Sequence, residues 1–185
     1  MLECFHRQNM LHSQILNILK TSACKNEEVR ELYLKRLKKD ALTRDENPES
    51  HFCAYFLPYN PKNKKVFIVH HKKSGLWFAP GGHIDKGETL WQTLNREIHE
   101  ELGVENFFKE LPPSFLFTIT NIENSTRPCK THFDIWFIME TNGDDFNIDP
   151  REFHDTKWLT FDEAEKIVID PANKNALKVI KQSFL

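Results

Sequence analysis

Three glutamates lie close together in the middle of the chain, in a pattern that could hold a divalent cation. At about 100° per residue, a helix would present Glu97, Glu100 and Glu101 within about a third of its circumference. Like charges at this spacing repel by roughly a few tenths of a kcal/mol per pair, and Arg96 offsets only part of that repulsion. Mg²⁺ or Mn²⁺ would reverse its sign, because both ions prefer oxygen ligands and also bind phosphate. The alternative for such a short pattern is a solvated acidic face.

A helix that follows a glycine loop must position these carboxylates. Thr89 is a suitable N-cap, and Gly103 suits a left-handed helix end. Upstream, the paired Gly81-Gly82 after Pro80 allows a sharp turn and the close approach of a ligand. Apolar residues between the two caps recur every four positions, which predicts an amphipathic helix that buries one stripe. The residues of this stripe are Leu90, Leu94, Ile98 and Leu102.

The spacing of these residues resembles the signature of the Nudix hydrolases. The matching positions are Gly82, Glu88 and the run Arg96-Glu97-Ile98-His99-Glu100-Glu101-Leu102-Gly103-Val104, which make a complete Nudix box over Gly82–Val104. A pattern that fixes glycines, acids, a base and aliphatic residues is far more specific than a short glycine motif. The resemblance implies an α/β fold, the Nudix α/β/α sandwich with a mixed β-sheet. Pro80-Gly81-Gly82-His83 and His132-x-Asp134 also resemble an uncharacterised subgroup of that family.

The resemblance also implies roles for the residues of the box. Glu88 and Arg96 are expected to form an ion pair that fixes the loop against the helix. Enzymes of this family take their general base from the box, here Glu97, or from a later loop. Glu152, six residues before Trp158, is the loop candidate, although an exposed acid is often merely solvated. The expected ligands of one or more Mg²⁺ ions are Glu97, Glu100, Glu101 and the backbone carbonyl of Gly81.

A second group of polar residues lies on a strand predicted from His132 to Glu140. Alternation places His132, Asp134 and Trp136 on one face and apolar residues on the other. A carboxylate beside a tryptophan on a sheet could contact substrate, and a solvent-facing surface is the alternative. His83, in the glycine loop, could reach a phosphate or could be a spectator. The remaining histidines show no spacing typical of metal ligands.

The chain divides near residue 47. Residues 1–47 are predicted to form an N-terminal helical extension, with two helices joined by a turn at 21–26, and residues 48–185 the Nudix hydrolase domain. The polar segment 44–50 separates them. The predicted strands are 51–57, 65–70, 76–79, 114–120, 132–140 and 158–159, and the predicted C-terminal helices, after an acidic loop at 141–156, are 161–169 and 173–184.

Composition narrows the class of protein. The 185 residues are 39% hydrophobic and 28% charged, which is typical of a soluble globular protein. A net charge of −2 argues against a long nucleic acid as partner. Neither a membrane-spanning apolar run nor a signal-peptide core is present, so no membrane partner is expected. A homodimer is possible. Zinc and disulfides are not expected, and cytoplasmic localisation is the default, because no C-x-x-C spacing links Cys4, Cys24, Cys53 and Cys129.

These features predict a Mg²⁺-dependent hydrolase. It would cleave the diphosphate bond of a nucleoside diphosphate linked to another moiety, with bound ions neutralising the phosphate oxygens. The main alternative is a Nudix-like module that senses a nucleotide or nucleotide sugar without cleaving it, although such modules commonly lose acids that this chain keeps. An isoprenoid diphosphate isomerase of the same fold would need an active-site cysteine in a setting that Cys53 and Cys129 do not show.

Overall fold

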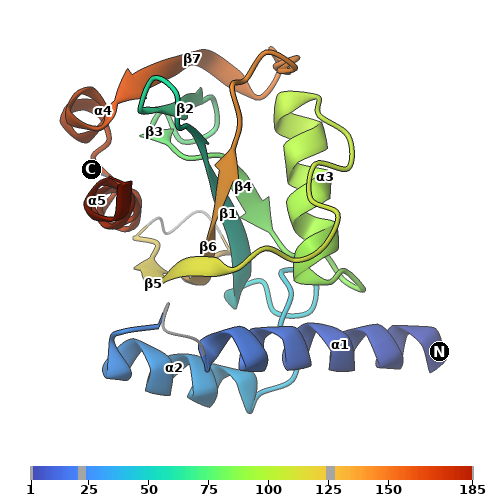
Figure 1. Ribbon diagram of the computed structural model, residues 1–185. Coiled ribbons are helices and arrows are strands. Elements are labelled where there is room, and N and C mark those ends of the chain that lie inside the picture. The colour runs from blue at the N-terminus through green and yellow to red at the C-terminus, as the bar shows by residue number, and fades with distance from the viewer. Residues whose placement is uncertain (1, 21–23, 124–127, 185) are drawn as a thin grey trace.

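A computed structural model of the chain describes residues 2–20, 24–123 and 128–184. Figure 1 shows a β-sheet with α3 on one side, α4 and α5 on the other, and α1 and α2 together along one end of the molecule. The helices are α1 (Leu2–Leu19), α2 (Glu27–Leu37), α3 (Leu90–Leu102), α4 (Phe161–Ile167) and α5 (Pro171–Phe184). The strands are β1 (Ser50–Asn60), β2 (Lys65–His71), β3 (Trp77–Phe78), β4 (Gly81–His83), β5 (Ser114–Asn121), β6 (Thr131–Glu140) and β7 (Phe153–Thr160).

Strand β1 is the centre of a mixed sheet. The strand order is β3-β2-β1-β6-β5, with β4 also paired to β1 and β7 to β2. The pairing of β1 with β6 is parallel from Ser50↔Thr131 to Tyr59↔Glu140, and the other pairings are antiparallel. Helices cover the sheet on both faces, so the predicted α/β/α sandwich with a mixed β-sheet is confirmed.

Each face of β1 belongs to a different apolar core, because successive side chains point to opposite faces of a strand. Phe52 and Phe56 lie in the core that α1, α2 and α3 share, whereas Leu57 and Tyr59 lie in the core beneath α4 and α5. All four side chains are buried, and burial of a large apolar side chain contributes about 1.5–3 kcal/mol. This double burial fixes the register of the central strands.

The two N-terminal helices pack directly on the domain. Tyr33 of α2 is fully buried, and its hydroxyl oxygen lies 2.8 Å from the carbonyl oxygen of Thr118 and 2.7 Å from that of Asp134. The side-chain oxygen of Gln14 in α1 accepts a hydrogen bond of 3.0 Å from the N–H of Leu90. The helical extension therefore contacts both the sheet and the start of α3, while the division of the chain near residue 47 stays a prediction.

Some predicted boundaries differ from the structure. Strand β7 is longer than the predicted strand 158–159, so the acidic loop ends at residue 152 instead of 156. Its pattern was weak because β7 is an edge strand that exposes His154, Asp155 and Lys157. The predicted turn at 21–26 falls partly on residues 21–23, which lie outside the described residues. Within the described part of the chain, no helix is both long enough and apolar enough to cross a membrane.

Candidate active site

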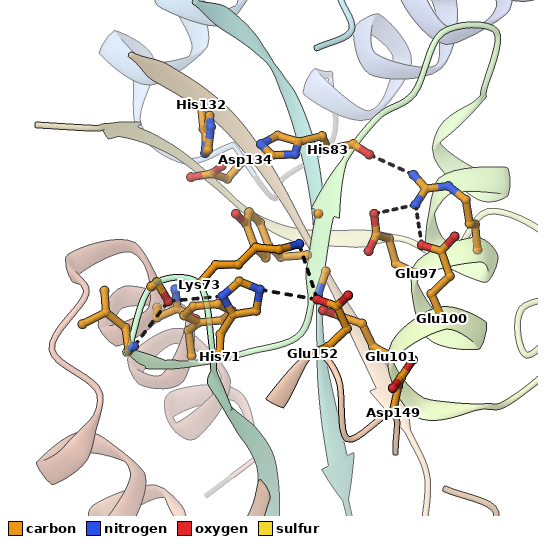
Figure 2. A pocket seen from close by; sticks show the side chains of 18 of the residues that line it. His71, Lys73, His83, Glu97, Glu100, Glu101, His132, Asp134, Asp149 and Glu152 are labelled. Atoms are coloured by element: carbon orange, nitrogen blue, oxygen red, sulfur yellow. Dashed lines mark hydrogen bonds and ion pairs between the residues drawn. The ribbon is translucent and has the colours of Figure 1, made fainter. Parts of the chain in front are cut away.

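Helix α3 is fixed at both ends. Thr89 and Gln92 form a capping box, in which the Thr89 hydroxyl accepts from the Gln92 N–H at 3.3 Å and the Gln92 side chain accepts from the Thr89 N–H at 3.0 Å. Gly103 ends the helix in a left-handed conformation with φ of 71°. The predicted apolar stripe is fully buried. This rigid helix turns Glu97 and Glu101 toward β4 (Figure 2).

Glycines in β4 let the helix carboxylates come close to the backbone. A Cβ atom at Gly81 would lie 2.5 Å from the carbonyl oxygen of Ala54, and φ at Gly81 is 130°, a value that favours glycine. A Cβ atom at Gly82 would lie 2.5 Å from Oε1 of Glu97. The N–H of Gly81 donates to Oε2 of Glu101 at 2.7 Å. Gly82 therefore makes the space for the Glu97 carboxylate, and Gly81 lets β4 lie close to β1.

Arg96 joins the loop to the carboxylates of the helix. Its Nε and Nη2 atoms donate to the two carboxylate oxygens of Glu88 at 2.8 and 3.0 Å, a bidentate pair. Nη1 donates to Glu97 at 2.8 Å and to Glu100 at 3.0 Å. Nη2 also donates to the carbonyl oxygen of His83 at 2.9 Å. Arg96 thus forms the expected ion pair with Glu88 and orients two of the three predicted ligands.

The negative charge of this site exceeds the positive charge beside it. Glu97 and Glu101 are each only 8% exposed, whereas Glu100 is exposed. Burial raises the pKa of Glu97 to about 7, against the opposing effect of Arg96, and burial and Glu97 raise the pKa of Glu101 well above its usual range. Two buried carboxylates with one guanidinium suit a divalent cation that binds oxygen.

The three carboxylates need a small rearrangement to share one ion. Among the described residues they do not form a compact ligand group, since Arg96 holds Glu100 and the N–H of Gly81 holds Glu101. Glu100 is exposed and at the end of a flexible side chain, so it can exchange its contact with Arg96 for an ion at low cost. The fourth predicted ligand is the carbonyl oxygen of Gly81. It belongs to the same residue of β4 whose N–H donates to Glu101.

The carboxylates open into a pocket of about 1390 Å³. Glu152, the loop candidate for the general base, lines the same pocket and lies next to Glu101 and Asp149 (Figure 2). Its carboxylate is 3.6 Å from Nζ of Lys73 and 3.9 Å from Nε2 of His71, and its side chain is 39% exposed. The structure therefore brings the two glycines of β4, the three glutamates of α3 and Glu152 to one cavity.

Asp134 lines the same pocket from the sheet, but it is almost completely buried, at 1% exposure. Its Oδ2 atom accepts hydrogen bonds from the hydroxyls of Thr118 and Thr120 at 3.1 and 2.5 Å, and its Oδ1 atom has no hydrogen-bond partner among the described residues. Burial raises its pKa to about 7. The alternative that this face of β6 is exposed to solvent is therefore wrong, because Asp134 and Trp136 are both buried. Trp136 stacks on Tyr55, with ring centroids 4.9 Å apart.

His83 and His132, predicted to bind substrate, belong to a cluster that the sequence did not reveal. The other members are His51 and Cys129, and potential ligand atoms of all four residues lie within 4.8 Å of one another. Burial lowers the pKa of His83 to about 3 and of His132 to about 4, so both rings are neutral. Spacing along the chain gives no sign of this cluster, because it depends on the pairing of β1 with β4 and β6.

Sequence comparison finds relatives over most of the chain. The model of the NUDIX domain matches residues 27–182. Nudix hydrolase 6 of Arabidopsis thaliana is 30% identical over 111 residues, which are 56% of this chain and 37% of that protein. An RNA pyrophosphohydrolase of Pelagibacter ubique is 29% identical over 125 residues, 59% of this chain and 76% of that protein. The matched part thus spans little more than a third of the plant relative.

Solved structures share the fold. The dihydroneopterin triphosphate pyrophosphohydrolase of E. coli superposes with a TM-score of 0.58 at 18% identity, over 70% of this chain and 95% of that one. The NUDIX domain of NrtR from Shewanella oneidensis, complexed with ADP ribose, gives 0.53 at 18% identity, over 72% and 88%. At these identities the likeness concerns the fold alone. With the family model covering residues 27–182 and the glutamates of α3 facing a glycine strand in a large pocket, the chain belongs to the Nudix hydrolase family.

Proposed function

We propose that the protein is a Mg²⁺-dependent hydrolase that cleaves the phosphoanhydride bond of a nucleoside diphosphate linked to another moiety. One observation carries the proposal. Glu97 and Glu101 are both buried in the lining of a pocket, and Arg96 alone does not balance their two negative charges. Buried carboxylates without sufficient compensation are costly, so such a pair is retained where a cation and its substrate share the charge.

The ligands of Mg²⁺, or of Mn²⁺ in its place, would be Glu97, Glu100, Glu101 and the carbonyl oxygen of Gly81. When bound, the ions would supply positive charge to the phosphate oxygens and lower the pKa of a water molecule. Arg96 and Glu88 would keep the carboxylates aimed at this position, since Arg96 contacts both Glu97 and Glu100. They act as positioning residues, which is the role that partners of metal ligands generally have.

Glu152 is our choice for the general base, with Glu97 as the alternative. Glu97 is buried and engaged by Arg96, whereas Glu152 is partly exposed and is not one of the proposed ligands. A base must lie within hydrogen-bond reach of the attacking water, and Glu152 lies beside the proposed ligand Glu101 in the pocket. Lys73, with Nζ 3.6 Å from the Glu152 carboxylate, would attract a phosphate to this part of the pocket.

The part of the pocket formed by the sheet would face the rest of the substrate. His83, His132 and Asp134 line it, and Asp134, with an unpartnered Oδ1 atom, can bind a hydroxyl or an amino group. A relative named RNA pyrophosphohydrolase and a fold neighbour complexed with ADP ribose suggest which nucleotides to test. A nucleotide substrate and reduced cysteines would both be consistent with a cytoplasmic location.

A hydrolysis screen tests the proposal. The purified chain, with Mg²⁺ or Mn²⁺, is offered dinucleotides, nucleotide sugars, ADP ribose, nucleoside triphosphates and RNA with a 5′-triphosphate, and phosphate-bearing products are measured. We expect activity that falls by about 10³-fold or more in Glu100→Gln and Glu101→Gln. Glu105→Gln, an exposed acid just beyond α3, is the matched control and should keep full activity.

Two results would refute the proposed activity. Equal turnover in wild type, Glu100→Gln and Glu101→Gln would show that the carboxylates do not hold a catalytic ion. Binding of a nucleotide without turnover, under either metal, would instead identify the sensor module that is the alternative for this fold.

A further inference from the structure

Three imidazoles and a thiol lie close together at the pocket, which His83, Cys129 and His132 line. His51, His83 and His132 form a triangle with ring centroids 4.8, 4.9 and 5.0 Å apart. The Sγ atom of Cys129 lies 4.0 Å from Nε2 of His83. This donor set is unlike the carboxylates of α3, because it consists of nitrogen and sulfur atoms.

The fold holds the four residues on separate segments. His51 pairs with His132 in the parallel register of β1 and β6, and His83 of β4 pairs with Cys53, two residues along β1. Side chains two residues apart on a strand share a face, so the three histidines meet. Cys129 precedes β6, in a segment held by hydrogen bonds of 2.9 Å from the N–H groups of residues 130 and 131 to the carbonyl of Glu49.

Two of the histidines carry polar atoms that no described residue contacts. His51 is 0% exposed and His132 is 9% exposed, and the Nε2 atom of each is buried without a hydrogen bond to the described part of the chain. Burying such an atom without a hydrogen bond costs about 1–3 kcal/mol. Nδ1 of His51 lies 2.9 Å from the carbonyl oxygen of Asn47. That contact requires Nδ1 to carry the proton and leaves the Nε2 lone pair free, as in most metal-bound histidines.

Neighbouring charge does not block the cluster. The guanidinium of Arg44 lies 3.5 Å from Nδ1 of His83, which is long for a hydrogen bond, and Arg44 is exposed and lies as close to Asp85.

We propose that His51, His83, His132 and Cys129 form a second metal site, which binds Zn²⁺ and is distinct from the carboxylate site. Zn²⁺ favours four tetrahedral nitrogen and sulfur ligands, whereas Mg²⁺ favours oxygen. With Zn–N bonds of about 2.0–2.1 Å, ligand atoms stand about 3.3 Å apart. The four potential ligand atoms here already lie within 4.8 Å, so no pair needs to approach by more than about 1.5 Å.

Four protein ligands leave no open position, so the ion has a structural role. It would tie β1, β4 and β6 to the segment that carries Cys129 and would fix the end of the strand that carries Gly81 and Gly82. His83 and His132 would then shape the wall of the pocket through the ion instead of touching the substrate. The site does not depend on the proposed hydrolase activity, because its ligands are not those of the catalytic ion.

Cobalt binding tests the assignment on the full chain. After removal of metals with a chelator, Co²⁺ is titrated and absorption is recorded. We expect one equivalent to give the visible bands of tetrahedral Co²⁺ together with a near-ultraviolet band from a thiolate bound to cobalt, and one equivalent of Zn²⁺ to displace both. Cys129→Ser should lose the near-ultraviolet band and bind Co²⁺ at least about tenfold more weakly. His51→Gln and His132→Gln should weaken binding likewise.

Control variants identify the thiol. Cys24→Ser changes a buried cysteine in the core that α1, α2 and α3 share, and it should leave both bands unchanged. Glu100→Gln, which should abolish hydrolysis, should also leave them unchanged, so failure of the hydrolase proposal and failure of this one are separate results. The assignment is overturned if the near-ultraviolet band is absent at one equivalent or persists in Cys129→Ser. It is equally overturned if Cys53→Ser removes that band, because Cys53, His132 and Asp134 form the other compact ligand group among the described residues.

Discussion

Substitution of Gly82 by alanine should separate activity from stability. The added Cβ would lie 2.5 Å from Oε1 of Glu97, whereas ordinary contacts begin near 3.4 Å, so the carboxylate must retreat by about 0.9 Å. The same oxygen accepts the 2.8 Å hydrogen bond from Arg96, which would be stretched or lost. A misplacement of about 1 Å in a catalytic group can cost about 100-fold in rate. We therefore expect kcat/KM to fall about 100-fold, equivalent to about 2.7 kcal/mol.

Stability should change little in the same variant. The atoms that the methyl group meets are the end of one flexible side chain, and φ at Gly82 is not in the left-handed region. Alanine also restricts the unfolded chain more than glycine does, which offsets part of the strain. The shift in Tm should stay within about 3 °C. Product release from the best substrate of the screen, at saturating Mg²⁺, and thermal unfolding followed by circular dichroism measure the two effects.

Gly75→Ala is the matched control with the opposite outcome. Gly75 has φ of 68° and no atom within 4 Å of an added Cβ, so alanine there is strained without a clash. We expect a loss of about 1–2 kcal/mol in stability and unchanged activity. If Gly82→Ala keeps activity within twofold of wild type, the position of the Glu97 carboxylate does not matter and the reasoning is refuted.

Three other variants test separate parts of the account. Glu152→Gln should lower kcat by about 10²-fold or more, as expected for loss of a general base, with KM nearly unchanged, while Asp149→Asn should not; an unchanged rate in Glu152→Gln would transfer the role to Glu97. Arg96→Lys should lower kcat/KM by about 10–100-fold and raise the Mg²⁺ concentration for half-activity, because lysine cannot bridge Glu88, Glu97 and Glu100; equal Mg²⁺ dependence would contradict a positioning role. Tyr33→Phe should lower the unfolding free energy by about 1–2 kcal/mol and Tm by about 3–6 °C without loss of activity, because a buried hydroxyl between two carbonyls is removed; an unchanged Tm would show that the hydroxyl adds nothing to the docking of α2.

The parts of the site that depend on local structure could be predicted from the sequence. The four-residue apolar period, the Thr89 cap and the Gly103 terminus define α3 within one residue, because helix geometry repeats along the chain. The pair of Arg96 with Glu88 was expected from the resemblance to the Nudix box, and it spans eight residues. The glycine that the box requires at position 82 also has a structural reason. Only a residue without a Cβ atom leaves room for the Glu97 carboxylate in its observed position.

Features that depend on long-range pairing were not predictable in this way. The His51 side chain meets His132 only because β1 and β6 pair in parallel with these residues in register. Asp134 is also buried because of strand pairing in the packed fold. The alternation of residues along β6 shows which side chains share a face, but it does not show whether that face is buried or exposed to solvent. Tyr33 likewise gave an apolar helix stripe but no indication that its hydroxyl reaches β5 and β6. Register between strands far apart in sequence is set by the packed fold.

The most direct test of the central claim is a crystal of the protein soaked in Mn²⁺ together with a nucleoside diphosphate analogue that cannot be hydrolysed. Anomalous scattering locates Mn²⁺ independently of the protein atoms. The account predicts Mn²⁺ bound by carboxylate oxygens of Glu97, Glu100 and Glu101, at about 2.1–2.3 Å, and by phosphate oxygens of the analogue. Analogue bound in the pocket with all three carboxylates free of Mn²⁺ would contradict it.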